Sequence, residues 1–196
     1  SYDRLLIATG AESFIPPVGN LREAENVFGL RHLRDAQAID ALAKDAENIV
    51  IIGSGLVGLD AAYGLMETGK KVSIVEMADQ ILPVQLDKTA ASEYQKRFEK
   101  AGAVFYLGRK AADTIMGEDK IIREIILDNG EKLPCDLIIV AAGVRSAVAG
   151  MEGEGIVIDR GIKVDDYLQT GAEGIYAAGD VTGLSGIWPN AQKQGE

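Results

Sequence analysis

The chain has 196 residues, 47% of them hydrophobic and 26% charged, which is ordinary for a globular protein of one large domain or two small ones. Its formal net charge is −10 and no run of Lys or Arg offsets it, so a nucleic-acid-binding surface is excluded. The 23 glycines exceed the usual share and indicate many tight turns or close backbone approaches, which nucleotide-binding folds need.

The sequence also argues against a membrane span and against export. The longest apolar stretches, such as residues 137–144, are much shorter than the roughly 20 residues that cross a bilayer. No charged leader followed by an apolar segment opens the chain. The single cysteine, Cys135, cannot form an internal disulfide. We therefore expect no membrane partner and a cytoplasmic location.

The first 46 residues predict little regular structure. An apolar strand is expected over residues 2–9 and ends at Gly10, and the proline-containing segment 11–20 is expected to be an irregular loop. Apolar residues recur at helical spacing over 34–44. We place a domain boundary close to Glu47.

The middle of the chain predicts alternating strands and helices, which is typical of a parallel sheet. Continuous apolar residues over 48–52 indicate a strand buried on both faces, and further strands are expected over 71–76 and 104–107. Helices are expected over 59–68 and from an N-cap at Asp87 to about residue 101. The inward face of the second helix is expected to consist of residues four positions apart, namely Leu86, Ala90, Tyr94 and Phe98.

After residue 110 the pattern changes to that of antiparallel strands. Three short strand-like runs are joined by turns at 117–119 and 128–130, and a buried strand follows over 137–141. The tail is expected to hold two more strands and a short helix, over 156–158, over 175–178 and near Asn190. The predicted fold class is therefore α/β, a Rossmann-like parallel sheet with a three-stranded antiparallel meander.

A glycine-rich loop stands between the strand over 48–52 and the helix that follows it. Gly53, Gly55 and Gly58 have the G-x-G-x-x-G spacing that binds the pyrophosphate of a dinucleotide. Gly53 would allow the tight turn, Gly55 the close approach of the phosphates and Gly58 the packing of helix on strand. The N–H groups at the start of the helix would bind the phosphates. We expect the residues between the glycines to bind the cofactor as well, namely Ser54, Leu56 and Val57.

Glu76 ends the strand after this helix, 18 residues beyond Gly58. This is close to the spacing of about 20 residues at which an acidic side chain hydrogen-bonds the adenosine ribose. A carboxylate there repels the 2′-phosphate of NADP, and the next three residues, Met-Ala-Asp, contain no cation. NAD(H) is therefore the expected cofactor. The alternative is a structural turn with a solvent-facing glutamate.

Four segments together resemble one family of flavoenzymes. They are Ala8-Thr9-Gly10, the Gly53 loop, residues 142–145 (Ala-Gly-Val-Arg) and residues 176–180 (Tyr-Ala-Ala-Gly-Asp). Over nearly the whole chain, their order and spacing are similar to those of the pyridine nucleotide-disulfide oxidoreductase superfamily. Within it, the chain is similar to the branch of NADH:rubredoxin reductase, NADH oxidase and the nitrite reductase flavoprotein. In that family an NAD domain is inserted into an FAD domain.

The resemblance implies a domain division. It assigns residues 1–46 to an FAD-domain remnant and linker, residues 47–147 to the NAD-binding domain and residues 148–196 to a second FAD-domain segment. The family's first G-x-G-x-x-G, for the FAD pyrophosphate, and its C-terminal interface domain are not in this sequence. We therefore expect a fragment that is inactive alone, with FAD as a cofactor of the full-length protein. A homodimer of the full-length protein stays open, because the family's dimer contacts come mostly from the C-terminal domain.

The resemblance also implies roles for matching residues. Thr9 and Gly10 would mark the crossing between the domains, and Gly143 would lie at a cofactor. Gly179 would give the chain a close approach to the flavin, and Asp180 would bind its ribityl hydroxyls. A helix starting at residues 188–191 would point at the flavin's pyrimidine ring, where its N-terminus would stabilise negative charge.

Three further residues need an interpretation. Asp60 stands where the family usually has a glutamate beside the nicotinamide; because it is one methylene shorter, an ordinary polar helix residue is the alternative. Cys135 has no partner cysteine and is expected to pack at the entrance of a buried strand. His32 lies in a polar stretch and is expected at the surface. No H-E-x-x-H, C-x-x-C or G-x-S-x-G motif occurs, and no metal ligand is predicted.

The resulting hypothesis is the NAD(H)-binding portion of an enzyme that transfers hydride from NADH to FAD and on to an unidentified electron acceptor. No catalytic side chain is predicted, because the two cofactors supply the chemistry. One alternative is a nucleotide-binding redox sensor or interaction protein of the same fold with slow turnover. Another is an NAD-dependent dehydrogenase without flavin, in which the segment 176–180 would have no task.

Overall fold

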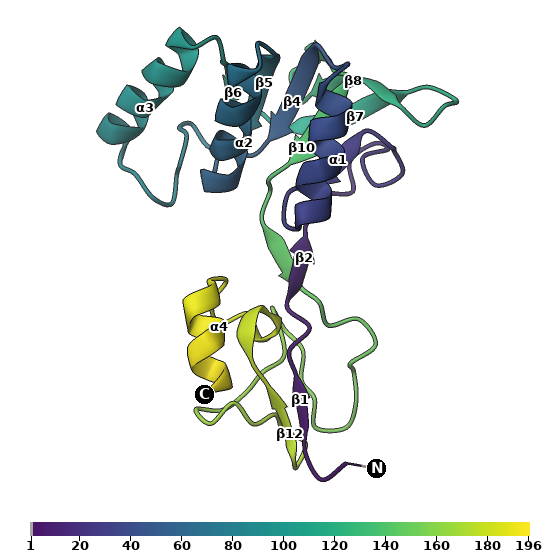
Figure 1. Ribbon diagram of the computed structural model, residues 1–196, viewed down its shortest axis with the longest axis vertical. Coiled ribbons are helices and arrows are strands. Elements are labelled where there is room, and N and C mark those ends of the chain that lie inside the picture. The colour runs from purple at the N-terminus through teal and green to yellow at the C-terminus, as the bar shows by residue number, and fades with distance from the viewer. Residues whose placement is uncertain (1) are drawn as a thin grey trace. The chain divides into compact units, whose positions relative to one another are not determined.

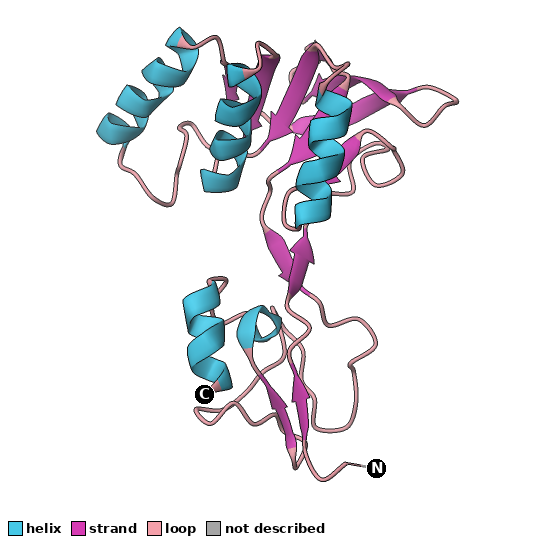
Figure 2. Cartoon of the chain, viewed as in Figure 1, coloured by secondary structure: helices cyan, strands magenta, loops and turns pink. Residues whose placement is uncertain are grey.

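The computed structural model describes residues 2–196, which form two compact units (Figures 1 and 2). The larger unit comprises residues 13–142, and the smaller unit comprises residues 2–12 and 143–196. This division differs from the expected domain boundaries. Residues 13–46 were expected in an FAD-domain remnant and linker, but they contribute a strand and a helix to the larger unit.

The larger unit is built on a five-stranded parallel sheet in the order β3-β10-β4-β5-β6. Its strands are β3 (Val27–Gly29), β4 (Asn48–Ile52), β5 (Lys71–Glu76), β6 (Val104–Leu107) and β10 (Leu137–Val140). The strands predicted over 48–52, 71–76 and 104–107 are confirmed with these bounds. Strand β3 was missed, because a run of three residues carries no measurable periodicity.

Three helices belong to the larger unit: α1 (Leu33–Ala43), α2 (Leu56–Glu67) and α3 (Lys88–Lys100). The predicted cap of α3 is confirmed, since Asp87 Oδ1 accepts a hydrogen bond from the N–H of Ala90 at 2.9 Å. Its predicted inward face is partly wrong. Tyr94 is 49% exposed, whereas Ala91 is 1% exposed, so a buried position of the helix lies one residue after the predicted Ala90.

The sheet is covered on both faces, which explains its continuous apolar strands. In β4, Ile49 and Ile51 pack in the cluster that contains the buried residues of the three helices. Between them, Val50 packs in a second cluster with the meander. The meander consists of β7 (Ala111–Met116), β8 (Ile122–Leu127) and β9 (Lys132–Pro134), paired antiparallel in that order as predicted.

The smaller unit has two short strand pairs and two short helices. β1 (Leu5–Ile7) pairs in parallel with β12 (Ile175–Ala177), and β2 (Ala11–Ser13) pairs with β11 (Val144–Ser146). The helices are a 3-10 turn, η1 (Gly179–Thr182), and α4 (Trp188–Gly195). The first strand, the strand near residue 175 and the terminal helix were therefore predicted in the right places.

Two further predictions fail. The segment 11–20 is not wholly irregular, because its first residues form β2; the partner strand β11 lies far along the chain, and local pattern cannot reveal it. The strand predicted over 156–158 is wrong. Ile156 and Ile158 make only isolated bridges to nearby residues, so this apolar segment folds back locally and joins no sheet.

Candidate functional site

The glycine loop lies at the carboxyl end of β4 and leads directly into α2. From β4 the chain continues to β5 and β6 on one side, while β10 and β3 lie on the other side. In open α/β sheets, ligands bind outside the carboxyl ends of the strands at such a switch point. The fold therefore places the loop where a ligand is expected.

The three glycines of the motif differ in the space around them. Gly53 has a φ of +107°, and a Cβ there would lie 2.5 Å from the carbonyl oxygen of Ala141. A Cβ at Gly58 would lie 2.1 Å from the carbonyl oxygen of Gly53. A Cβ at Gly55 would have no protein atom within 4 Å. The fold itself therefore requires Gly53 and Gly58, whereas the open side of the loop at Gly55 fits the close approach of a ligand.

The first turn of α2 is suited to an anion. Gly55 is the N-cap of the helix, and its carbonyl oxygen accepts the first helical hydrogen bond, from the N–H of Leu59 at 3.0 Å. Helix geometry leaves the N–H groups of the first turn without partners inside the helix, and they carry partial positive charge. Leu56 and Val57 are exposed in this turn. The predicted phosphate-binding groups are thus accessible at the helix end.

Glu76 lies at the carboxyl end of β5, next to the loop. Its Oε2 accepts hydrogen bonds from the N–H of Ser54 at 2.8 Å and from the hydroxyl of Ser54 at 2.9 Å. Its Oε1 accepts one from the N–H of Ala78 at 2.8 Å. The carboxylate is therefore half-buried and fixed against the glycine loop, unlike the solvent-facing glutamate of the alternative interpretation. Ser54 is fully buried, so its side chain faces Glu76 and not solvent.

Sequence reasoning missed one residue beside Glu76. The N–H of Arg109 donates to the carbonyl oxygen of Glu76 at 3.0 Å, and the N–H of Gly108 donates to that of Ala78 at 2.8 Å. The segment after β6, which contains the cationic Arg109, thus lies next to the segment after β5. The three residues after Glu76 contain no cation, but the parallel pairing of β5 with β6 is the signal that reveals Arg109.

In the smaller unit, three of the predicted cofactor residues lie around one hollow of about 340 Å³. Gly10 has a φ of +73°, and a Cβ there would meet no atom within 4 Å. Gly179 has a φ of +80°, and its N–H donates to Oε1 of Gln194 in α4 at 2.7 Å. Asp180 also lines the hollow, and its carbonyl oxygen accepts a hydrogen bond from the hydroxyl of Ser146 at 2.8 Å. Two glycine backbones and a carboxylate residue therefore surround a space that could hold part of a cofactor.

The other two predicted residues lie elsewhere. The hydroxyl of Thr9 donates to the carbonyl oxygen of Ala147 at 2.8 Å, and Thr9 lines a different hollow together with Met151. Gly143 is exposed with a φ of +93°, and a Cβ there would meet no atom within 4 Å. The hollow at Gly10 thus does not include these two residues.

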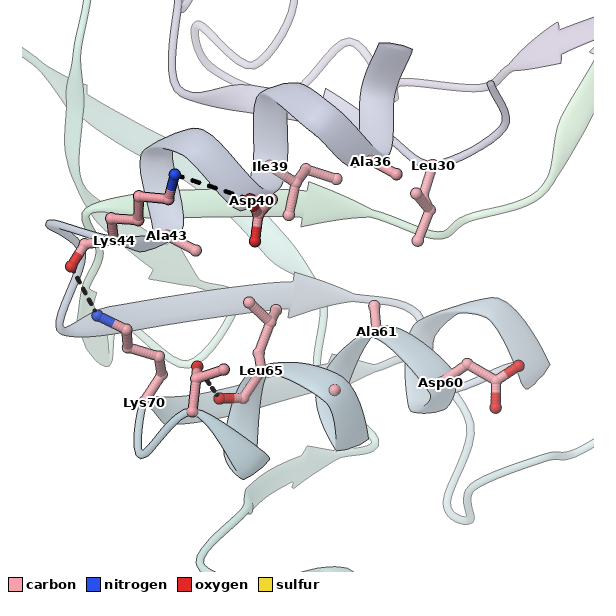
Figure 3. Close-up of a pocket in the computed structure, with 12 residues that line it drawn as sticks. Leu30, Ala36, Ile39, Asp40, Ala43, Lys44, Asp60, Ala61, Leu65 and Lys70 are labelled. Carbon is pink, nitrogen blue, oxygen red and sulfur yellow. Dashed lines mark hydrogen bonds and ion pairs between the residues drawn. The ribbon is translucent and has the colours of Figure 1, made fainter. Parts of the chain in front are cut away.

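A second candidate in the larger unit is a groove of about 270 Å³ between α1 and α2 (Figure 3). Its lining is mostly aliphatic, and three of its four charged residues interact with each other or with backbone. Lys44 lies 4.0 Å from Asp40, and Nζ of Lys70 donates to the carbonyl oxygen of Lys44 at 3.0 Å. Asp60 is exposed on α2 at the opposite end of the groove. Because polar groups do not converge here, the glycine loop is the better candidate site.

Cys135 and His32 occupy the positions that the sequence predicted. Cys135 is 2% exposed, and burial raises the pKa of its thiol to about 12, so it stays a neutral thiol and not a nucleophile. His32 is exposed at the start of α1, where its N–H donates to a carboxylate oxygen of Asp35 at 2.8 Å. Both predictions, packing and surface, are confirmed.

Two features are absent from residues 2–196. The described chain holds no group of three or more His, Cys, Asp or Glu side chains placed to bind a metal ion. No helix in it combines the length and the apolar composition needed to cross a membrane.

The sequence matches known proteins over nearly its whole length. It is 38% identical, over 92% of the chain, to the assimilatory nitrate reductase electron transfer subunit of Bacillus subtilis, and covers 23% of that protein. It is 37% identical, over 92% of the chain, to the NADH oxidase of Methanocaldococcus jannaschii, and covers 40% of it. The chain thus spans from about a quarter to about half of the length of such relatives.

The fold matches solved structures as well. A NAD-dependent persulfide reductase from A. fulgidus superposes with a TM-score of 0.89 at 31% identity, over 99% of this chain and 38% of that chain. The family described as pyridine nucleotide-disulphide oxidoreductase matches residues 1–195. The chain belongs to the pyridine nucleotide-disulphide oxidoreductase family.

Proposed function

We propose that this chain carries the NAD(H)-binding site of a flavin-dependent oxidoreductase that takes hydride from NADH and passes electrons through FAD to an acceptor. One observation carries the proposal. The glycine loop is closed at Gly53 and Gly58 and open at Gly55, and Glu76 is fixed beside it. A dinucleotide needs this arrangement, because its pyrophosphate must approach the backbone closely while a carboxylate binds the adenosine ribose.

The residues of the larger unit would divide the work as follows. The N–H groups at Gly55, Leu56 and Val57 would bind the pyrophosphate at the positive end of α2. Glu76 would accept hydrogen bonds from the ribose hydroxyls through Oε1, to which one donor within residues 2–196 is bonded, the N–H of Ala78. A 2′-phosphate would meet the same fixed negative charge, so NADH should be preferred over NADPH.

In the smaller unit, Gly10, Gly179 and Asp180 would hold part of the flavin. Thr9 and Gly143 do not line that hollow and stay cofactor residues predicted from the sequence. When bound, FAD would supply the chemistry of accepting hydride from NADH. This chain's residues would orient the two cofactors, and none need act as an acid or base. We assign no acceptor, because the names of the relatives differ in this respect: one is a nitrate reductase subunit and another a nitric oxide reductase FlRd-NAD(+) reductase. Homodimer formation and a cytoplasmic location stay predictions from the sequence.

The first experiment is an anaerobic mixing of the full-length protein with NADH, with the flavin absorbance followed over time. Bleaching within the turnover time of an ordinary enzyme supports the proposal, because typical kcat values are about 1–1000 s⁻¹. Bleaching slower than that range favours the redox sensor. A protein without flavin absorbance that oxidises NADH would be the flavin-free dehydrogenase, and the proposal would fall.

The second experiment tests Glu76 itself. We expect Glu76→Arg to bind NADPH more tightly and NADH more weakly than the wild type, because the charge facing the ribose is reversed. Glu76→Gln is the matched control, since it removes the charge and keeps an acceptor oxygen for Ser54, although its amide nitrogen cannot accept the hydrogen bond from the N–H of Ala78. If neither variant changes the preference between NADH and NADPH, the assignment of Glu76 is wrong.

A further inference from the structure

The hydroxyl of Ser54, in the glycine loop, donates a hydrogen bond to Glu76, the residue proposed to bind the ribose. Ser54 is fully buried, yet it contributes two donors, its N–H and its hydroxyl, to the same oxygen of Glu76. The two residues are 22 positions apart in the sequence and meet because adjacent parallel strands end at the same edge of the sheet. The carbonyl oxygen of Ser54 accepts a hydrogen bond from the N–H of Leu82 at 3.0 Å, which also ties the loop to the segment after β5.

Counting donors shows what this contact does to the carboxylate. An ionised carboxylate has about four lone-pair sites. Two donors from Ser54 use both sites on Oε2, and the N–H of Ala78 uses one on Oε1. One site therefore stays free for an external donor, on Oε1. Because both oxygens are held, the carboxylate cannot rotate without breaking hydrogen bonds.

We propose that Ser54 is a positioning residue that sets the coenzyme preference by holding the Glu76 carboxylate in one orientation. This inference rests on the proposed function of the site. The held carboxylate presents Oε1 to a ribose hydroxyl and keeps its charge where a 2′-phosphate would lie. Without the serine hydroxyl, Oε2 of Glu76 keeps only the backbone N–H of residue 54 as a donor. The carboxylate is then held less firmly, binds the ribose less well and turns away from a 2′-phosphate more easily.

The test uses two probes that bind the adenosine end alone, ADP-ribose and 2′-phospho-ADP-ribose. Neither contains nicotinamide, so no hydride is transferred and binding is measured by calorimetry on the full-length protein. Hydrogen bonds to charged groups are the strong class. The wild type should bind ADP-ribose more tightly than 2′-phospho-ADP-ribose. We therefore expect Ser54→Ala to reduce this preference for ADP-ribose by about tenfold. Most of the change should be weaker binding of ADP-ribose.

A matched control separates positioning from general stability. Thr68→Val removes a hydroxyl that donates to the carbonyl oxygen of Leu65 at 2.7 Å, at the other end of α2. It should leave the affinity ratio unchanged. A thermal melt of each variant checks that both fold. A lower melting temperature in both variants with a changed ratio only in Ser54→Ala supports positioning.

A double-mutant cycle shows whether Ser54 acts through Glu76. In a Glu76→Ala background there is no carboxylate to orient, so adding Ser54→Ala should change the affinity ratio less than twofold. A tenfold effect that persists in this background overturns the inference, as does an unchanged ratio in Ser54→Ala alone. If the wild type binds ADP-ribose and Ser54→Ala has the same affinity ratio as the wild type, only this inference fails. If the wild type binds neither probe, the proposed NAD(H) site fails and the inference falls with it.

Discussion

The two compact units differ in how completely they bury their apolar residues. The larger unit has a cluster on each face of its sheet, one shared with the helices and one with the meander. The smaller unit has one small cluster of four buried residues, namely Ile7, Ile162, Ala177 and Val181. It leaves several large apolar side chains exposed, namely Leu6, Tyr167, Leu184, Ile187 and Trp188.

The difference follows from how each unit is assembled. The larger unit comes from one continuous stretch, residues 13–142, and its strands are buried on both faces. The smaller unit combines residues from both ends of the chain around two-stranded pairs, which are marginal by themselves. The glycine loop thus rests on a well-packed sheet, whereas the hollow at Gly10 and Gly179 rests on little buried surface. We infer that the nucleotide site is the more preorganised of the two candidate sites.

The largest effects should come from glycines whose missing side chain the packing requires. A Cβ at Gly58 would lie 2.1 Å from the Gly53 carbonyl oxygen, and one at Gly161 would lie 2.4 Å from backbone atoms of Val181 and Thr182. Backbone cannot give way as a flexible side chain does, so each Gly→Ala change should destabilise its own unit by about 3 kcal/mol. Amide hydrogen exchange would locate the loss, with Gly58→Ala affecting the larger unit and Gly161→Ala the smaller one.

Gly64→Ala is the control for this pair. Gly64 lies in the middle of α2, and a Cβ there would meet no atom within 4 Å. Alanine should therefore stabilise the helix by up to about 1 kcal/mol. If Gly58→Ala and Gly64→Ala raise or lower the melting temperature alike, the packing role of Gly58 is wrong. If Gly58→Ala and Gly161→Ala each speed up amide hydrogen exchange in both units, the two units do not unfold independently.

Exchange in the wild type should differ between the units as well. The central strands β4 and β10 pair on both sides and are buried over most of their length. β1 and β12 form a two-stranded sheet to which Gln169 adds one isolated bridge at Tyr176. We expect amides of β4 and β10 to exchange at least about a hundredfold more slowly than those of β1 and β12, because slow exchange requires the opening of a packed core. Equal protection in the two sheets would contradict the comparison drawn above.

Gly55→Ala tests the open side of the loop. Its φ of −72° suits alanine and its surroundings are empty, so the free energy of unfolding should change little. A methyl group there would occupy the space proposed for the pyrophosphate. We expect ADP-ribose binding to weaken by about thirtyfold, equivalent to about 2 kcal/mol. Calorimetric titration beside Gly64→Ala would check this, and unchanged affinity would place the phosphates elsewhere.

The sequence predicted the central sheet well because its signals are local. A continuous apolar run marked β4 to the residue, and the spacing of Gly53, Gly55 and Gly58 predicted which glycine has open space. These features depend on neighbours within a few residues. A strand buried on both faces and a tight turn each leave a signature in the residues that form them.

The features that were missed depend on distant partners. β2 pairs with β11 across most of the chain, and β3 joins the sheet beside β10, so neither could be found from its own three residues. The contact between Ser54 and Glu76 also exists only after two strands align. For Tyr94 the cause is different: a four-residue repeat drifts relative to the 3.6-residue helical turn, and the smaller Ala91 takes the buried position.

The smallest expected effect concerns how the larger unit joins two of its strands. Just before β10, a carboxylate oxygen of Asp136 accepts hydrogen bonds from the N–H of Asn48 at 2.8 Å and of Glu47 at 3.0 Å, at the start of β4. The hydrogen bond from Asn48 contributes most to holding the pKa of the Asp136 carboxyl below its usual range, and the bond from Glu47 adds to it, although burial opposes the shift. A depressed pKa means that the folded state favours the ionised form. The stabilisation is therefore present above about pH 4, where an unfolded aspartate ionises, and is lost as the pH falls through the lower folded pKa.

Asp136→Asn should remove this contribution. Because the side chain is exposed, solvent screening limits the loss to about 1 kcal/mol at pH 7. Urea unfolding of the wild type and the variant should show this difference at pH 7 and a smaller one at pH 3. Asp128→Asn is a matched control, since one of its carboxylate oxygens accepts a long, weak hydrogen bond, from the N–H of Lys110 at 3.4 Å. Suppose that Asp136→Asn lowers the free energy of unfolding equally at both pH values. The loss would then come from poor packing of the amide, and the ionised carboxylate would not hold β4 to β10.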